Sequence, residues 1–153
     1  MSLDGIRGEY KENSLILYGN LKRKVFFTDQ EIPYPDGKLI VSRTDLDGII
    51  THVNQSFVDM SGYTEVELVG APHSILRHPD MPPVAFKDLW DTVRDNRKWQ
   101  GYVKNLRKDG AYYWVKATVI PNIREGKVVG YTSVRRKPSR TKIDECIKLY
   151  ATL

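Results

Sequence analysis

Alternating apolar and polar residues mark strands at both ends of the chain's central region. Alternation over residues 39–44 and 49–54 flanks an Asp47-Gly48 pair. Asp-Gly supplies the positive φ of a tight hairpin, so these segments are predicted to be two antiparallel strands. Three more strands, joined by turns that contain glycine, are predicted over residues 99–107, 111–121 and 127–137.

The region between the two strand groups carries helical signals. Residues 55–70 indicate short helices, because their apolar positions are interrupted by a Ser61-Gly62 break. A longer helix follows, since four apolar residues recur at helical spacing and would form one buried face: Phe86, Leu89, Trp90 and Val93. We expect Asp80 to cap the start of this helix ahead of two prolines, and the helix to end near Asn96.

Strands at both ends with helices between them indicate an α+β domain, with helices packed on one face of a five-stranded antiparallel sheet. Alternation leaves large apolar side chains on the other face as well: Tyr102, Leu106, Tyr112, Trp114 and Ile120. Monomers rarely leave such a face bare. We therefore expect the apolar runs at 15–18 and 25–27 to cover it, within one chain or from a second copy. The predicted divisions are an N-terminal arm (1–35), a central domain (36–137) and a tail with a helical pattern (138–153).

Charge and composition narrow the function classes. The 153 residues include 24 Lys and Arg against 19 Asp and Glu, an excess too small to favour a nucleic-acid partner. The basic run at 135–137 is interpreted as a solvated strand end. The single Cys146 excludes an intramolecular disulfide and a thiolate metal cluster. No apolar window reaches the ~18 to 20 residues of a membrane span, so we expect a cytoplasmic segment with no membrane insertion of its own.

Catalytic motifs are not visible in the sequence. It contains no glycine-rich phosphate loop, serine elbow or carboxylate pair, so we expect a binding protein and not an enzyme. Three histidines, His52, His73 and His78, leave a haem or metal ligand open, although no carboxylate or thiolate partners recur at metal-ligand spacing.

The segment from His73 to Trp99 has the residue types that a planar heteroaromatic ligand needs. Trp90 and Trp99 offer faces for stacking, the Asn105 amide can pair with a ring edge, and Arg77 can neutralise phosphates. The alternative is that both tryptophans fill the core and that Arg77 and Asp80 form an ordinary loop pair.

Residues 50–54 (Ile-Thr-His-Val-Asn), 61–64 (Ser-Gly-Tyr-Thr) and 72–82, with its Arg-His-Pro-Asp-Met-Pro run, form a distinctive set. Together with Trp99, Gly101 and residues 112–115, they closely resemble the PAS sensor domains of the bacterial aerotaxis receptor family, over residues 36–137. This resemblance implies a PAS fold that holds FAD between sheet and helices. It also implies that the redox state of the FAD reports oxygen supply or electron transport.

Motif matching extends the resemblance to individual residues. It implies that Arg77, His78, Asp80 and Asp88 are needed for FAD retention. His73, at the start of the same segment, is included among the cofactor-binding residues. It also implies that four residues line the pocket: Asn54, Trp90, Trp99 and Asn105.

The resemblance also implies a role and partners for the chain. The chain would be the cytoplasmic input module of an aerotaxis or chemotaxis transducer, in a parent protein held at the inner membrane. A homodimer would form through the outer sheet face or the arm, and residues 141–153 would lead as a helix to a downstream signalling module. The alternative is a PAS interaction module whose pocket is empty or holds a small metabolite.

Overall fold

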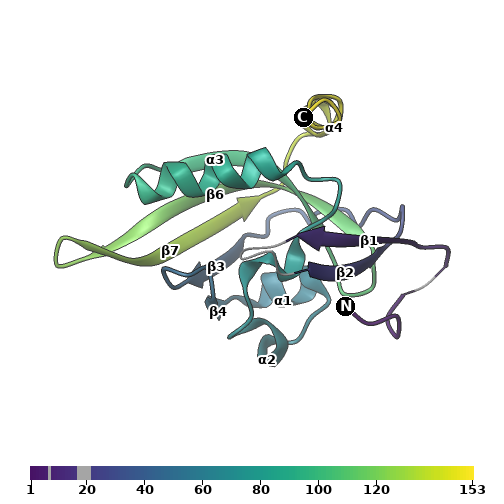
Figure 1. Ribbon diagram of the computed structural model, residues 1–153, viewed down its shortest axis with the longest axis horizontal. Coiled ribbons are helices and arrows are strands. Elements are labelled where there is room, and N and C mark those ends of the chain that lie inside the picture. The colour runs from purple at the N-terminus through teal and green to yellow at the C-terminus, as the bar shows by residue number, and fades with distance from the viewer. Residues whose placement is uncertain (7, 17–21) are drawn as a thin grey trace.

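The computed structural model describes residues 1–6, 8–16 and 22–153 (Figure 1). The strands are β1 (Lys11–Ile16), β2 (Lys22–Phe27), β3 (Ile40–Thr44), β4 (Ile50–Val53), β5 (Trp99–Leu106), β6 (Tyr112–Arg124) and β7 (Lys127–Arg136). The helices are α1 (Gln55–Ser61), α2 (Glu65–Leu68), the short 3-10 helix η2 (His73–Leu76), α3 (Pro83–Arg94) and α4 (Arg140–Tyr150). None of the helices in these ranges is long and apolar enough to cross a membrane.

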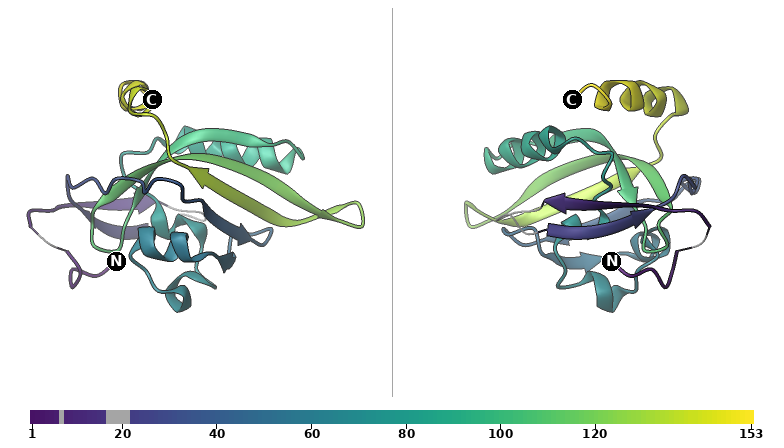
Figure 2. Two further views of the ribbon diagram at one scale, coloured as in Figure 1. Left: turned by 180° about the vertical axis from the view of Figure 1, so that it is seen from behind. Right: turned by 45° about the vertical axis from the view of Figure 1, so that its right-hand side comes forward.

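The main sheet has five antiparallel strands in the order β4-β3-β7-β6-β5. Its hairpins turn at Gly48 and Gly110, which have φ angles of 79° and 86°. Figures 1 and 2 place α1 and α2 on one side of the β6–β7 part of the sheet and α4 on the other. The predicted α+β class, with a five-stranded antiparallel sheet and helices over one face, is confirmed.

One hydrophobic core joins the inner face of the sheet to the helices between β4 and β5. Phe57 of α1, Leu68 of α2 and Val93 of α3 are fully buried in it. Tyr113 and Val115 reach the same core from β6, while Lys116 between inward-facing neighbours is exposed. The predicted alternation of β6 is therefore confirmed.

The start of α3 differs from the prediction. Its N-cap is Pro82, which makes no side-chain cap, and Pro83 occupies the first turn, where a missing N–H leaves no helical hydrogen bond unmade. Asp80 does not cap the helix, because its carboxylate accepts a hydrogen bond from Lys104 Nζ at 2.8 Å. The helix ends at Arg94, slightly before the predicted end.

The N-terminal arm packs on the end of β5 and covers the predicted outer face at Leu106 only, which corrects the prediction that it covers this face as a whole. Leu15 of β1 and Val25 of β2 are buried against Leu106, the last residue of β5. The apolar run predicted at residues 15–18 continues into residues 17 and 18, which lie outside the described residues. Figure 2 shows the β1–β2 hairpin apart from α4.

The arm also holds η2 and the segment that follows it. Arg23 Nη1 donates hydrogen bonds to the carbonyl oxygens of Ser74 at 3.1 Å and Ile75 at 2.8 Å. The ring of Phe27 meets that of His78 edge to face, with 5.2 Å between their centroids. The arm is therefore part of the support for the segment that carries the Arg-His-Pro-Asp-Met-Pro run.

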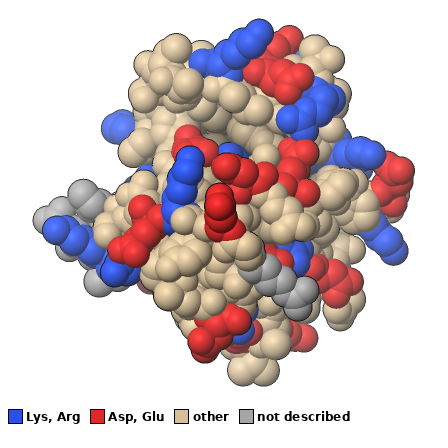
Figure 3. Space-filling view, turned by 90° about the vertical axis from the view of Figure 1, so that its right-hand side faces the viewer, with Lys and Arg blue, Asp and Glu red and all other residues tan. Residues whose placement is uncertain are grey.

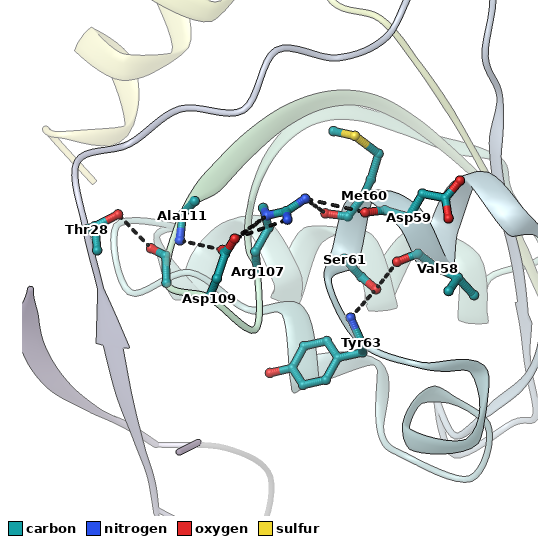
Figure 4. Close-up of polar contacts among 10 residues, drawn as sticks. Thr28, Val58, Asp59, Met60, Ser61, Tyr63, Arg107, Asp109 and Ala111 are labelled. Carbon is teal, nitrogen blue, oxygen red and sulfur yellow. Dashed lines mark hydrogen bonds and ion pairs between the residues drawn. The ribbon is translucent and has the colours of Figure 1, made fainter. Parts of the chain in front are cut away.

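A polar network around Arg107 ties the β5–β6 turn to α1 and to the arm (Figure 4). Arg107 Nη1 donates to the Met60 carbonyl oxygen at 2.7 Å, and Arg107 Nη2 pairs with the Asp109 carboxylate at 3.1 Å. The backbone N–H of Thr28 donates to the carbonyl oxygen of Gly110 at 2.8 Å. The β5–β6 turn thus holds α1 and the arm together.

Helix α4 covers the outer sheet face around Trp114. Ile143, Cys146 and Tyr150 recur at helical spacing and pack against this indole. The Trp114 and Tyr150 rings stack at 6.2 Å between centroids, and the Tyr150 hydroxyl donates to the Tyr102 carbonyl oxygen at 2.7 Å. The tail therefore covers the predicted apolar outer face around Trp114, whereas Ile120 on the same face is 40% exposed.

Charged side chains of both signs are mixed on the face shown in Figure 3. Many form exposed pairs, such as Lys24 with Glu12 and Arg140 with Glu31, each at 2.8 Å. Exposed pairs of this kind contribute about 0–1 kcal/mol to stability. These pairs place negative side chains next to positive ones, so the small excess of positive charge is spread among negative charges.

Replacing Ile143 by aspartate is expected to release α4 from the sheet. Burial of an isoleucine side chain contributes about 1.5–3 kcal/mol, and an unpaired carboxylate at the same place adds a desolvation penalty. Ile143 is 7% exposed, whereas Ile147 one turn later is 46% exposed and provides the matched control. Limited trypsin digestion should cut Ile143→Asp within α4 much faster than Ile147→Asp. Equal rates for the two variants would contradict the docking of this helix.

Candidate functional site

A pocket lies between the inner face of the main sheet and the η2–α3 region, and encloses about 120 Å³ of free volume. Its largest walls are aromatic: Phe86 and Trp90 from α3, Trp99 from β5 and Tyr131 from β7. Its polar and charged lining residues include one carboxylate and two arginines: Thr44, Asp47, His73, Ser74, Arg77, Asn105, Ser133 and Arg135. Mainly apolar walls with a few polar groups are the usual composition of a small-molecule site.

A buried arginine lies on the sheet side of this pocket. Arg135 of β7 is 2% exposed. Its Nη2 donates to Ser42 Oγ at 3.1 Å and lies 2.6 Å from His73 Nε2, while its guanidinium carbon is 5.0 Å from the centroid of the Phe57 ring. Its Nη1 is buried and has no hydrogen-bond partner among the described residues. The interpretation of Arg135 as part of a solvated strand end is therefore wrong.

Electrostatics make this wall of the pocket positive. Burial lowers the pKa of Arg135 to about 10, which leaves the guanidinium protonated at neutral pH. Burial, together with the neighbouring Arg135 charge, lowers the pKa of His73 to about 3. The His73 imidazole is consequently neutral and can accept a hydrogen bond from Arg135 Nη2.

The opposite side of the pocket is shaped at the edge of β5. Arg77 and Asn105 pair through their backbones in an antiparallel bridge, and both side chains line the pocket. The guanidinium carbon of Arg77 lies 4.6 Å from the centroid of the Phe86 ring. The segment after η2 thus extends the sheet by one short pairing and brings a second cation to the pocket.

Both tryptophans line the pocket, and each is held in place. Trp99 Nε1 donates to Asp88 Oδ2 at 2.9 Å. Its indole lies across Gly101, where an added Cβ would be 2.5 Å from the ring. Trp90 meets the Tyr131 ring edge to face at 5.5 Å. Position 101 therefore needs glycine if the indole is to stay where it is.

Comparison with known proteins identifies the family of this fold. Residues 50–135 match the model of the family described as the PAS fold. The chain belongs to the PAS family. Its architecture is similar to a PAS domain from Colwellia psychrerythraea, with a TM-score of 0.61, 25% identity, and coverage of 67% of this chain and 87% of that one. It also resembles the light state of the photoreceptor Aureochrome1 LOV, with a TM-score of 0.63, 22% identity, and coverage of 74% and 88%, a likeness in fold.

The sequence of this PAS domain is also similar to the aerotaxis receptor of Escherichia coli (strain K12). The two are 46% identical over 128 residues, which cover 84% of this chain and 25% of the receptor. The chain thus spans about a quarter of that receptor's length, and the resemblance to the aerotaxis receptor family is confirmed.

Five of the predicted site residues of the PAS domain lie together in the pocket lining: His73, Arg77, Trp90, Trp99 and Asn105. The other four, Asn54, His78, Asp80 and Asp88, are not among its lining residues. Each of these four residues instead contacts an element whose other residues line the pocket. Asp88 contributes through its hydrogen bond to Trp99.

His78 and Asp80 lie beside the pocket and hold the segment that carries Arg77. His78 is 1% exposed and sits between the rings of Phe27 and Tyr112, at 5.2 and 6.0 Å between centroids. Its Nδ1 accepts a hydrogen bond from the backbone N–H of Asp80 at 3.0 Å. Burial lowers the pKa of His78 to about 3, against the smaller opposing effect of Asp80.

Asn54 holds α1 in place. Its Oδ1 accepts from the backbone N–H groups of Phe57 at 3.0 Å and Val41 at 3.1 Å, and its Nδ2 donates to the Leu39 carbonyl oxygen at 2.8 Å. This side chain both caps the helix and ties it to β3. It fixes Phe57, on whose ring the Arg135 guanidinium rests.

Sequence reasoning missed three pocket residues on the inner face of β7: Tyr131, Ser133 and Arg135. Their alternation is visible in the sequence, because every second residue from Tyr131 faces inward. Extending that period to the end of the strand would have placed Arg135 in the core. Arg135 was grouped instead with the basic residues that follow it, Arg136 and Lys137, and was interpreted as solvated with them.

Proposed function

We propose that this PAS domain binds FAD and reports redox state or oxygen supply, as the cytoplasmic input module of an aerotaxis or chemotaxis transducer. What supports this function is a pocket that combines stacking faces, an amide and two cations, with Arg77 at the β5 edge and Arg135 on β7. The similarity to a receptor named for aerotaxis favours the same assignment.

The residues of the pocket fit a flavin in chemical type. Trp90 and Trp99 offer aromatic faces to a planar ring, Asn105 offers both a donor and an acceptor to a ring edge, and Arg77 can pair with phosphate oxygens. The buried Nη1 of Arg135 is a donor in need of an acceptor.

Volume sets a condition on binding. The pocket encloses about 120 Å³, whereas ligand sites are commonly about 300–1,000 Å³. We therefore expect the wall that α3 provides to shift when a flavin ring enters, since Phe86 and Trp90 line the pocket from this helix. The same observation favours the second candidate function, a PAS interaction module whose pocket is empty or holds a small metabolite.

Bound FAD would supply a ring that gains electrons and changes its charge. The chain's part is to bind the two forms of the ring with different free energies, since only such a difference can shift a conformational equilibrium. Asn105 and the segment from Arg77 to Asp80 meet at the edge of β5, where a change of hydrogen bonding would alter the pairing of that segment with the sheet. A homodimer through the outer sheet face would first require α4 to leave Trp114.

Purified protein tests the proposed function. It should be yellow, show a flavin absorption spectrum that bleaches on reduction, and release FAD on denaturation. Arg77→Ala and Trp90→Ala should each lower flavin occupancy about tenfold or more while circular dichroism stays folded, because each removes a principal contact. Val84→Ala is the control, since this α3 residue is 50% exposed and away from the pocket.

Three outcomes would count against the proposal. Protein that remains colourless after FAD is supplied would reject it and favour the small-metabolite module. A haem spectrum would reject it in favour of a histidine ligand. Full flavin occupancy in both variants would reject the assignment of Arg77 and Trp90 to the flavin contacts.

A further inference from the structure

The guanidinium of Arg135 is a buried charge that forms no ion pair with a carboxylate among the described residues; Asp47 also lines the pocket, but it is exposed. The charged or titratable neighbours of Arg135 are the phenols of Tyr113 and Tyr34 and the neutral imidazole of His73. A buried ion normally carries a desolvation penalty of several kcal/mol unless it is paired, and proteins therefore rarely keep one. An unbalanced charge that lines a ligand pocket points to a ligand that balances it.

Arg135 is also held in one orientation. Ser42 and His73 both engage its Nη2, and the Phe57 ring supports the plane of the guanidinium. These contacts engage one terminal nitrogen of the guanidinium, Nη2. The other, Nη1, has no hydrogen-bond partner among the described residues. A fixed donor with a full positive charge recognises an acceptor atom that is electron-rich or negative.

We propose that Arg135 is the specificity-determining residue of the pocket, whose Nη1 donates to an acceptor atom on the flavin ring edge and whose charge favours the reduced, negatively charged ring over the oxidised, neutral one. The inference rests on the proposed FAD function. Two electrons and one proton convert the neutral oxidised ring into a reduced ring with one negative charge, so the fixed cation stabilises the product of that reduction more strongly than the oxidised ring. His73 is a positioning residue, because it accepts from Nη2 and keeps Nη1 free.

Variants that separate charge from shape test the inference. Arg135→Met removes the charge and fills a similar volume, Arg135→Lys keeps the charge, and Arg136→Met on the exposed side of β7 is the matched control. Each purified holoprotein is titrated with dithionite and redox mediators, and its midpoint potential and flavin content are measured. Thermal unfolding of each apoprotein reports stability independently of FAD.

Arg135→Met should lower the ratio of affinities for reduced and oxidised FAD at least tenfold, which is a downward shift of about 30 mV for a two-electron couple. Arg135→Lys should retain most of the wild-type potential, and Arg136→Met all of it. The Arg135→Met apoprotein should be at least as stable as the wild type, because an apolar side chain in place of a buried unpaired charge removes a desolvation penalty. If Arg135→Met does not fold, Arg135→Gln must show the same downward shift.

Two results would overturn the inference while leaving the FAD function intact: Arg135→Met with flavin bound at the wild-type potential, or Arg135→Lys shifted as far as Arg135→Met. A wild-type protein that takes up no FAD overturns both the inference and the proposed function.

Discussion

Phe57→Ala is expected to lower the free energy of unfolding by about 3–5 kcal/mol, the usual cost of truncating a fully buried phenylalanine. Phe57 is 0% exposed and joins the core to the pocket. Its ring packs against that of His73 at 6.3 Å and lies under the Arg135 guanidinium at 5.0 Å. The variant therefore loses packing and also exposes a buried cation to an unfilled space. Urea unfolding followed by circular dichroism measures the loss.

Phe57→Leu is the matched variant, because it keeps an apolar side chain in the core while removing the aromatic ring. Its loss should be much smaller, about 1–2 kcal/mol. The flavin content of Phe57→Leu should fall only modestly, since Ser42 and His73 still hold the guanidinium. A loss below about 1 kcal/mol for Phe57→Ala would contradict the central place of this ring in the core.

Stability is expected to fall as the pH drops below about 6.5, with His78 as the main cause. The pKa of His78 is about 3 in the folded protein, against about 6.5 in the unfolded chain, so between these values the unfolded chain binds a proton that the folded protein does not. The stability that the neutral imidazole provides is thus fully present above pH 6.5 and is lost as the pH falls toward 3. At pH 5 the loss from His78 alone is about 2 kcal/mol.

Other groups act in the same direction. His73 has a lowered pKa and adds to the loss, although less, because its side chain is only partly buried. Hydrogen bonds from Lys137 and Lys108 lower the carboxyl pKa values of Asp36 and Glu67, so these pairs are lost at still lower pH.

Urea unfolding at pH 7 and pH 5 measures the effect in the protein without cofactor. His78→Gln should reduce the difference between the two pH values by about 2 kcal/mol, and His52→Gln, on the exposed face of β4, should leave it unchanged. An undiminished difference between the two pH values in His78→Gln would assign the acid sensitivity to other groups, such as His73.

The periodicity of the sequence predicted the elements well, because each follows from a local rule. Alternation placed the strands, glycine with positive φ placed the hairpins, and the spacing from Phe86 to Val93 placed α3. Coverage of the outer face could not be predicted in this way, since both the arm and the tail are apolar enough to cover it. The choice depends on tertiary geometry, which brings Leu15 to Leu106 and Ile143 to Trp114.

The candidate site was only partly accessible to sequence reasoning for a related physical reason. Residues that line the pocket, such as Trp90, lie on a face that periodicity reveals. Residues that hold the lining in place, such as Asn54 and Asp88, act through hydrogen bonds to partners whose positions the sequence does not specify. Arg135 was missed although its strand period was visible, because a basic residue near a strand end is usually solvated.

Strand β6 is the structural element shared by the pocket and the tail helix. Ala117 and Val119 line the pocket, and Trp114 on the other side of the strand packs against α4. The two surfaces are separated by the thickness of a single polypeptide backbone. Under the proposed function, a displacement of β6 on ligand binding would therefore reach α4 directly, with no chain of intermediate residues between the pocket and this helix.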